Sequence, residues 1–182
     1  NSYFVTDKSY FAIEPRLSLK QTIAQNLSAK ASYSYMTQGI HRLVTNNLIM
    51  PSDIWVPITK NVPLMKSHLW GLGMNYEVAG FCFSAETYYK TLSNVLEYRN
   101  GASYFVADQN WQEIVALGKG RSYGFELLAE RKVGNTTGWV SYTWSKALRK
   151  FDQPGNEING GKEFYAATDR RNNFSANVTQ HF

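Results

Sequence analysis

The chain has 182 residues, of which 43% are hydrophobic, 15% aromatic and only 18% charged. Its mean hydropathy of −0.38 shows that apolar residues are interleaved with polar ones. The net charge of +5 comes from scattered basic residues, and without a run of Lys and Arg this argues against a nucleic-acid partner. The lone Cys82 excludes a disulfide framework and a Cys-based metal site.

No window of 18 apolar residues occurs, so the sequence holds no candidate transmembrane helix. A membrane-crossing β-strand needs only about 9–11 alternating residues. The chain begins with Asn1, in a polar stretch, without an initiator Met or a signal peptide. We therefore expect it to be one piece of a longer protein.

Alternation with a period of two predicts seven strands, because successive side chains of a strand point to opposite faces. The predicted strands cover residues 11–20, 27–35, 68–77, 81–90, 121–131, 136–146 and 173–182. The hairpin over residues 121–146 shows the pattern most clearly. One face of its first strand carries Tyr123, Phe125, Leu127 and Ala129, and the other carries Glu126 and Glu130.

The connections between these strands alternate in length. Tight turns are predicted near residues 21–26, 77–80 and 132–135, and long loops of about 25–30 residues over residues 36–67, 91–120 and 147–171. Face parity requires an odd-length turn around Ile23 and even-length turns at the other two. All tight turns then lie at one end of the sheet and all long loops at the other, which is typical of outer-membrane β-barrels.

Aromatic residues of the apolar face fall into two groups with aliphatic residues between them. Toward the long loops lie Tyr35, Trp70, Tyr89, Tyr123 and Trp144, and toward the tight turns lie Tyr76, Phe81 and Phe182. Strand propensity alone explains why Tyr and Trp are present but not where they are placed. The placement matches the aromatic girdles of a membrane barrel.

These patterns predict an all-β, antiparallel, up-and-down transmembrane β-barrel fragment, with residues 1–182 as a single segment of about seven strands. Bacterial single-chain barrels have an even number of strands. An open edge in the bilayer would leave unpaired backbone groups at several kcal/mol each, so we expect more strands on both sides. A passive porin, an adhesion-type barrel and a soluble β-sandwich binding module stay open as alternatives.

The opposite face of the predicted strands is polar and of mixed charge. It is expected to face the barrel lumen, either water or a polar plug, rather than an ion-selective channel. The charged residues assigned to it are Glu14, Arg16, Lys20, Lys30, Glu77, Glu86, Lys90, Glu126 and Glu130.

Catalytic and cofactor motifs are missing from the sequence, so we expect no enzyme activity and no cofactor. His41, His68 and His181 share no metal-ligand spacing, and Gly118-Lys119-Gly120 lacks the pattern of a phosphate loop and is predicted as a turn. Binding residues are expected in the long loops instead. The candidates are Trp55, Arg99, Tyr104, Trp111, Arg149, Lys150, Lys162, Asp169, Arg170 and Arg171.

Five segments carry a family resemblance: EPRLSL (14–19), PSDIWVPIT (51–59), YYKTLSNVLEYRNGASYF (88–105), GKGRSYGFELLAERKVGNTTGWVSYTWSKALRKF (118–151) and INGGKEFYAATDRRNNFS (158–175). In this order and spacing they resemble the barrel region of TonB-dependent receptors, especially the type with an added N-terminal carboxypeptidase-regulatory-like domain. The family commonly has Pro at the position of Tyr165.

The resemblance implies a barrel of about 22 strands in the bacterial outer membrane, with its lumen plugged by the receptor's own N-terminal domain. It also implies uptake of a scarce nutrient, energised by an inner-membrane protein that acts on a box near the N-terminus. The expected partners are therefore outer-membrane lipid, the plug and remaining barrel strands, the energising protein and an unknown nutrient ligand.

Overall fold

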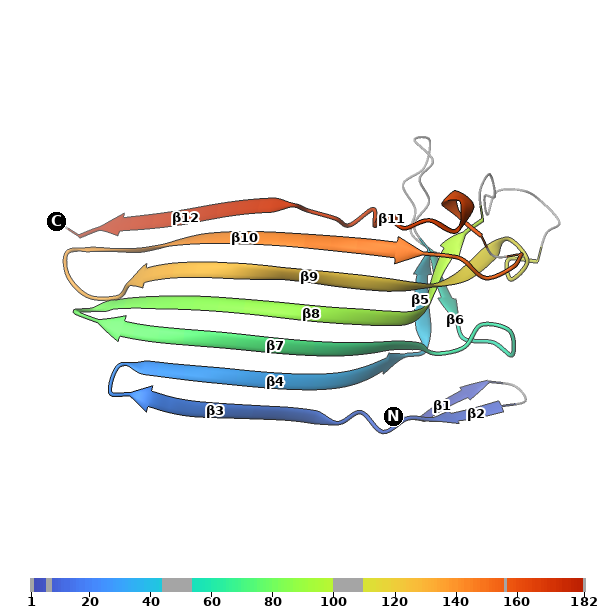
Figure 1. The fold of residues 1–182 in the computed structure, drawn as a ribbon, viewed down its shortest axis with the longest axis horizontal. Helices are drawn as coiled ribbons and strands as arrows, with labels where there is room; N and C mark the ends of the chain where they lie inside the picture. The colour runs from blue at the N-terminus through green and yellow to red at the C-terminus, as the bar shows by residue number, and fades with distance from the viewer. Residues whose placement is uncertain (1, 6–7, 44–53, 100–109, 156, 182) are drawn as a thin grey trace.

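The computed structural model describes residues 2–5, 8–43, 54–99, 110–155 and 157–181. Its main body is one eight-stranded antiparallel sheet (Figure 1). The strands are β3 (Arg16–Ala24), β4 (Leu27–Gln38), β7 (Met65–Val78), β8 (Phe81–Tyr98), β9 (Val115–Arg131), β10 (Thr136–Lys150), β11 (Phe164–Tyr165) and β12 (Asn172–Gln180). The spatial order is β11-β10-β9-β8-β7-β4-β3, and β12 also pairs with β10.

Smaller elements gather at one end of this sheet. Two hairpins are formed by β1 (Ser2–Val5) with β2 (Lys8–Phe11), and by β5 (Ile40–Leu43) with β6 (Ile54–Pro57). A single 3-10 turn, η1, covers Asn159–Gly161. Figure 1 shows these elements at the end where the long loops lie, with the tight turns at the opposite end. Among the described residues, no helix is long and apolar enough to cross a membrane.

The seven predicted strands are confirmed, with one change at the start of the first. Strand β3 begins at Arg16 rather than at residue 11, and it runs on to Ala24. Pro15, which precedes it, has no N–H to give to a ladder, although its carbonyl oxygen accepts a 3.0 Å bond from the backbone N–H of Tyr35. Its polar neighbour Glu14 therefore lies outside any strand.

The expected turn parities are confirmed as well. In the first hairpin, a β-bulge between Thr22 and Ala24 adds the extra residue that gives the connection its odd length. In the second, Tyr76 opposes Phe83, and the two-residue turn has positive φ at Ala79 and Gly80, as a two-residue hairpin with matched twist requires. The side chains of the strands on either side of these turns therefore lie on the faces that the sequence predicts.

The long loops are shorter than predicted because the strands continue into them. Strand β8 runs to Tyr98, β9 starts at Val115 and β10 ends at Lys150. A second bulge falls at Asn94, where φ is +60° and the register of β8 against β9 shifts by one residue. Arg149 and Lys150, predicted as loop residues, consequently lie in a strand.

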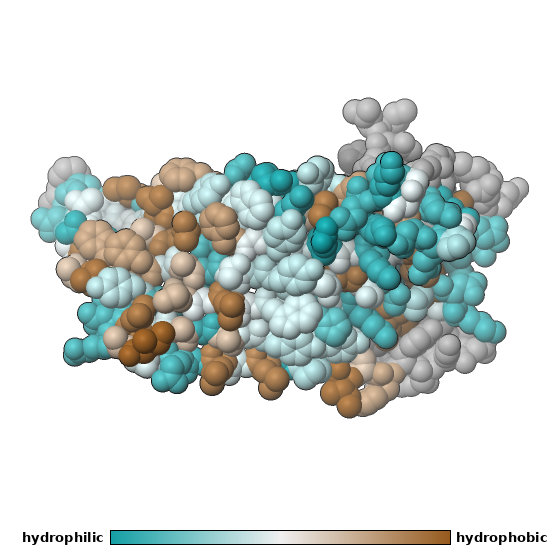
Figure 2. Space-filling view, viewed as in Figure 1, coloured by the Kyte–Doolittle hydropathy of each residue, from teal (hydrophilic) through white to brown (hydrophobic). Residues whose placement is uncertain are grey.

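The apolar face of the sheet is exposed along its whole width. Leu17, Leu72 and Val178 expose 66%, 62% and 72% of their surface, and no second layer covers this face in the described part of the chain. A β-sandwich would bury such a face, so the soluble alternative does not fit. Figure 2 shows hydrophobic side chains concentrated toward the tight-turn end and hydrophilic ones toward the long-loop end.

Two buried clusters lie at the long-loop end instead of between layers. In the first, Leu43 and Val56 of the β5–β6 hairpin pack with Leu96, Ile114 and Val115. The second contains Leu92, Val95, Ala116, Phe151 and Ile158. These clusters hold the described segments that follow the strands, so the described part of the long-loop end is packed against the sheet.

Strand β3 forms one edge of the sheet, and β11 and β12 together form the other. Each of the three pairs on one side only within the described residues. The expectation that further strands continue the sheet on both sides stays a prediction. It follows from the cost of unpaired backbone groups in a bilayer.

Gly118 lies inside β9 and not in the predicted turn, and it makes room for Phe151. A Cβ atom there would lie 2.5 Å from the carbonyl oxygen of Lys150 and would clash with the Phe151 ring. We expect Gly118→Ala to destabilise the long-loop end by about 1–3 kcal/mol, as overpacking does. Faster proteolysis of residues 151–158 would measure this loss.

Gly73→Ala is the matched control. The atoms nearest to its Cβ would be those of the flexible Glu86 side chain, with Cγ at 3.3 Å, so the proteolysis rate should stay at that of the unmodified chain. Equal rates for both variants would contradict the packing role of Gly118.

Candidate functional site

A row of aromatic rings crosses the apolar face and marks where the long-loop end begins. Ring centroids are 5.7 Å apart for Tyr33 and Trp70, 6.0 Å for Trp70 and Tyr89, and 6.3 Å for Tyr89 and Tyr123. The row continues from Tyr123 to Trp144 at 6.0 Å. Cross-strand register produces it, because Tyr33, Trp70, Tyr89 and Tyr123 oppose one another along the sheet.

Beyond this row, on the long-loop side, lies a polar hollow of about 190 Å³. It is built from the ends of β4, β5, β8 and β10 together with residues 166–168. Its polar lining consists of Gln38, His41, Arg42, Glu97, Arg149 and Thr168. These residues lie far apart in the sequence and are brought together by the sheet and by the third long connection.

The bulge at Asn94 places Glu97 on the polar face of the sheet. Past the bulge Glu97 opposes Ala116, while Arg149 opposes Gly120, so both point to the face that carries Glu126. Without the extra residue, strand alternation would put Glu97 on the apolar face. The bulge is thus the feature that lets a carboxylate and a guanidinium share the hollow.

Glu97 and Arg149 are partly dehydrated, and both lie past the aromatic row. Burial raises the pKa of Glu97, and the charge of Arg149 opposes that rise. Burial likewise lowers the pKa of Arg149, and the charge of Glu97 opposes that fall. Gly120 leaves room for the guanidinium, since a Cβ there would lie 3.3 Å from Arg149 Cζ. The hollow therefore offers two opposite charges to a ligand.

His41 forms part of the same wall and is almost fully buried. Only 2% of its surface is exposed, and its Nε2 donates a 3.0 Å hydrogen bond to the carbonyl oxygen of Pro63. Burial lowers the pKa of His41 below its ordinary 6.5, and the bond to Pro63 partly offsets this.

The lowered pKa of His41 predicts acid sensitivity of the β5–β6 hairpin. The unfolded histidine binds a proton more readily than the folded one, so stability is lost as pH falls below 6.5. Proteolysis within the hairpin should accelerate between pH 7.5 and about 5, and His41→Asn should flatten this dependence. An unchanged pH profile in the variant would exclude His41 as the cause.

Among the sequence-predicted binding residues, Arg149 is the one in the hollow's lining. Lys150 pairs with Asp152 at 2.6 Å. Asp169 accepts a 2.6 Å bond from the Ala147 backbone N–H and pairs with Arg171 at 3.1 Å. These contacts tie the third long connection to the end of β10.

The other candidates lie elsewhere. Trp55 is 61% exposed on β6, and Trp111 packs against the first buried cluster. Arg99 donates from Nε to the carbonyl oxygen of Val115 at 3.1 Å, and the carbonyl oxygen of Arg170 accepts from Ser145 Oγ at 2.8 Å. Tyr104 lies outside the described residues.

Sequence reasoning missed Gln38, His41, Arg42, Glu97 and Thr168. Glu97 fell in a predicted loop because β8 was expected to end at residue 90. An Asn in a strand tolerates the positive φ of a bulge, but that signal was too general to locate one.

The charged residues assigned to the polar face lie there in register, with one exception. Lys30 opposes Gly73, Gly73 opposes Glu86 and Glu86 opposes Glu126 on neighbouring strands. The three charged residues of this row line a second polar hollow of about 210 Å³. Arg16 shares another row with Lys90.

Glu14 departs from the assignment. Its Oε1 accepts bonds from the Thr37 backbone N–H at 2.8 Å and from Thr37 Oγ1 at 2.6 Å. Thr37 shares the face of Tyr33 and Tyr35, because alternate residues of β4 point the same way. The alternation of faces does not apply to Glu14, because the residues directly before β3 are not in a strand.

Metal-binding chemistry is not indicated in the described part of the chain. No group of three or more His, Cys, Asp and Glu side chains is arranged there to hold a metal ion.

The main antiparallel sheet has an exposed apolar face, an aromatic row and its own tight turns at one end, and these features define a fragment of a transmembrane β-barrel. The chain matches the family described as TonB dependent receptor-like, beta-barrel, over residues 1–181. It belongs to that family and is part of an outer-membrane receptor barrel. Neither a curated protein nor a solved structure matches it.

Proposed function

We propose that the chain forms part of the wall and the extracellular mouth of a nutrient importer in the bacterial outer membrane. The family match over residues 1–181 carries this proposal, since the members of the family are transporters. In this arrangement the tight turns lie in the periplasm and the long loops lie outside the cell.

The polar face is proposed to line the lumen, against the receptor's own plug domain. Mixed charges in register, such as Lys30 beside Glu86 and Glu126, suit a polar surface that packs against a protein plug or water. The remaining strands would complete a barrel of about 22 strands in total. An inner-membrane energising protein would supply the energy for import. The added carboxypeptidase-regulatory-like domain stays a prediction.

The hollow beside Glu97 and Arg149 is proposed as a contact point for the nutrient. It lies at the long-loop end and on the polar face, where an incoming solute would pass. Its polar groups come from strands and from a segment tied down by Asp169, so the site is largely preformed, as ligand sites usually are. Arg149 supplies a fixed positive charge and Glu97 an acceptor.

Energised uptake separates an importer from a passive porin. Strains with and without the full-length receptor would be compared for growth on limiting ferric siderophore, cobalamin, glycan or peptide. We expect loss of growth on one of these, and the same loss when the energising inner-membrane protein is deleted. Growth that depends on the receptor but not on the energising protein would support a porin and contradict the proposal.

A further inference from the structure

The polar hollow contains two opposite charges that do not meet. Glu97 and Arg149 are both half-buried, and neither side chain is joined to another described residue by an ion pair or a hydrogen bond. Burial raises the pKa of Glu97 and lowers the pKa of Arg149, so their attraction across the hollow does not offset the loss of water. A charge removed from water without a direct partner costs free energy. A ligand that pairs with both groups would remove that cost.

The strand register keeps the two charges apart. Glu97 opposes Ala116 and Arg149 opposes Gly120, and both of these partners belong to β9. The two positions on β9 share one face and lie about 13 Å apart along the strand, at about 3.3 Å per residue. The guanidinium of Arg149 lies over Gly120, where a Cβ atom would come within 3.3 Å of Cζ. The space between the guanidinium and the carboxylate is therefore open to a ligand.

The size of the hollow limits what it can enclose. Its volume of about 190 Å³ is below the range of about 300–1,000 Å³ that is typical of pockets for drug-sized ligands. Its apolar lining consists of Met65, Val95, Leu96, Ala166 and Ala167. Such a hollow suits a small charged group with a short aliphatic side chain, and it is too small to enclose a whole cobalamin or ferric siderophore.

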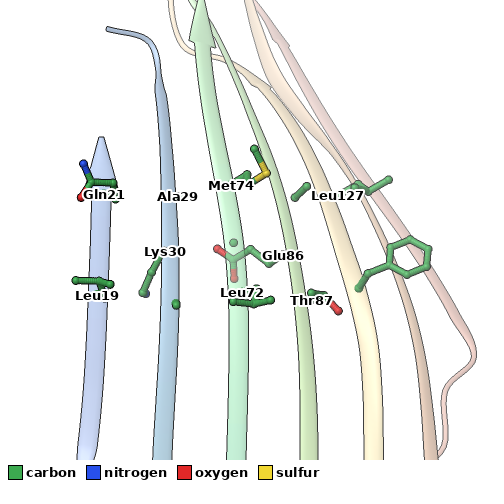
Figure 3. Close-up of a pocket in the computed structure, with 13 residues that line it drawn as sticks. Leu19, Gln21, Ala29, Lys30, Leu72, Met74, Glu86, Thr87 and Leu127 are labelled. Carbon is green, nitrogen blue, oxygen red and sulfur yellow. The ribbon is translucent and has the colours of Figure 1, made fainter. Parts of the chain in front are cut away.

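A larger hollow of about 550 Å³ lies on the apolar face and differs in its chemistry. It is lined mainly by Leu, Ala, Met and Phe side chains, and Figure 3 shows Leu19, Leu72, Met74 and Leu127 around it. In the proposed orientation this face meets hydrocarbon, so a solute that crosses the lumen would not reach it. The polar hollow is therefore the better candidate for a charged nutrient.

We propose that the polar hollow binds a zwitterion, with its ammonium group against Glu97 and its carboxylate against Arg149, as an amino acid or a short peptide would provide. The inference rests on the proposed function and narrows the nutrient to one chemical class. A carboxylate fits a guanidinium because two parallel N–H···O bonds can form, and an ammonium group offers three donors to a carboxylate. The half-buried setting strengthens both contacts relative to water.

The test measures equilibrium binding to the full-length receptor in detergent by isothermal titration calorimetry. The probes are alanine, alanyl-alanine, N-acetyl-alanyl-alanine and alanyl-alanine amide, so that each charge of the dipeptide is removed in turn. We expect each blocked peptide to bind about tenfold more weakly than alanyl-alanine, as loss of one charge-assisted contact predicts. Tighter binding of alanine than of the dipeptide would support the proposal with a free amino acid as the ligand. No binding of either at about 1 mM, or equal binding of the dipeptide and its blocked forms, would overturn it.

Two variants assign the charges of the probe to the two residues. Glu97→Gln should weaken alanyl-alanine about tenfold but should not weaken its N-acetyl form, which has no ammonium group. Arg149→Gln should weaken alanyl-alanine by a similar factor but should not weaken the amide, which has no carboxylate. Equal weakening of all the probes by either variant would show a structural role and overturn the proposal. Glu130→Gln is the matched control, because Glu130 lies on the polar face near the tight turns, and it should change none of the affinities.

The outcomes separate this inference from the importer proposal. A receptor that supports energised uptake of another nutrient, but binds neither alanine nor alanyl-alanine, would overturn the inference and leave the importer proposal standing. A receptor that binds alanyl-alanine with the expected charge dependence, but takes up its nutrient without the energising protein, would support the inference and contradict the importer proposal.

Discussion

Replacing Leu127 by Arg should destabilise the folded barrel by about 2–4 kcal/mol. Leu127 lies on the exposed apolar face, 48% exposed, midway between the aromatic row at Tyr123 and the tight turn that follows Arg131. If this face contacts hydrocarbon, the guanidinium must be dehydrated or must distort the bilayer to reach water. Urea unfolding of the full-length receptor refolded in lipid vesicles measures the loss.

Thr143→Arg is the matched control for that substitution. Thr143 opposes Glu126 on the neighbouring strand, so it lies at nearly the same depth but on the polar face. Its new charge would meet Glu126 and water, and the free energy of unfolding should change by less than about 1 kcal/mol. Equal losses from both variants would mean that the apolar face is not in contact with lipid.

Replacing Arg149 by Leu should lower nutrient uptake about tenfold or more, because the hollow loses its half-buried positive charge. The variant also removes the charge that opposes the raised pKa of Glu97, so Glu97 should take up a proton more readily. A carboxyl without its partner no longer offers the same acceptor to a ligand. Initial uptake rates at several nutrient concentrations would show whether the apparent affinity or the maximal rate falls.

The double variant Glu97→Gln with Arg149→Leu separates folding from binding. Arg149→Leu alone leaves the Glu97 carboxylate without its counter-charge and should speed proteolysis of the long-loop end. The neutral amide of the double variant needs no counter-charge, so its proteolysis rate should return toward that of the unmodified chain. Uptake should stay low, because the guanidinium is still absent. Recovery of uptake in the double variant would show that Arg149 acts by supporting the wall and does not contact the nutrient.

Strand positions and register followed from alternation because each strand has one apolar and one polar face. A slip by one residue would exchange the two faces, which is why Tyr76 opposes Phe83 and not its neighbour. The odd-length turn near Ile23 was predicted from parity alone, although its form as a bulge between Thr22 and Ala24 was not. The parity of the strand faces thus constrains the number of residues in a turn, but not the conformation of the turn.

The hollow could not be predicted for a different physical reason. Its walls depend on where strands end, and β8 extends to Tyr98 because packing against residues of the β5–β6 hairpin stabilises it. The face of Glu97 depends on a bulge at Asn94 that alternation does not reveal. Arg149 was identified as a binding candidate, but as a loop residue. At this end of the sheet, tertiary contacts rather than the local sequence pattern determine where the strands end.

The orientation of the sheet across the membrane is tested most directly by labelling of single cysteines on intact cells. In a Cys82→Ser background, Gln153→Cys would mark the long-loop end and Asn135→Cys the tight-turn end. A membrane-impermeant maleimide should label residue 153 on intact cells and residue 135 only after the outer membrane is opened. Labelling of residue 135 on intact cells, with residue 153 protected, would contradict the proposed mouth.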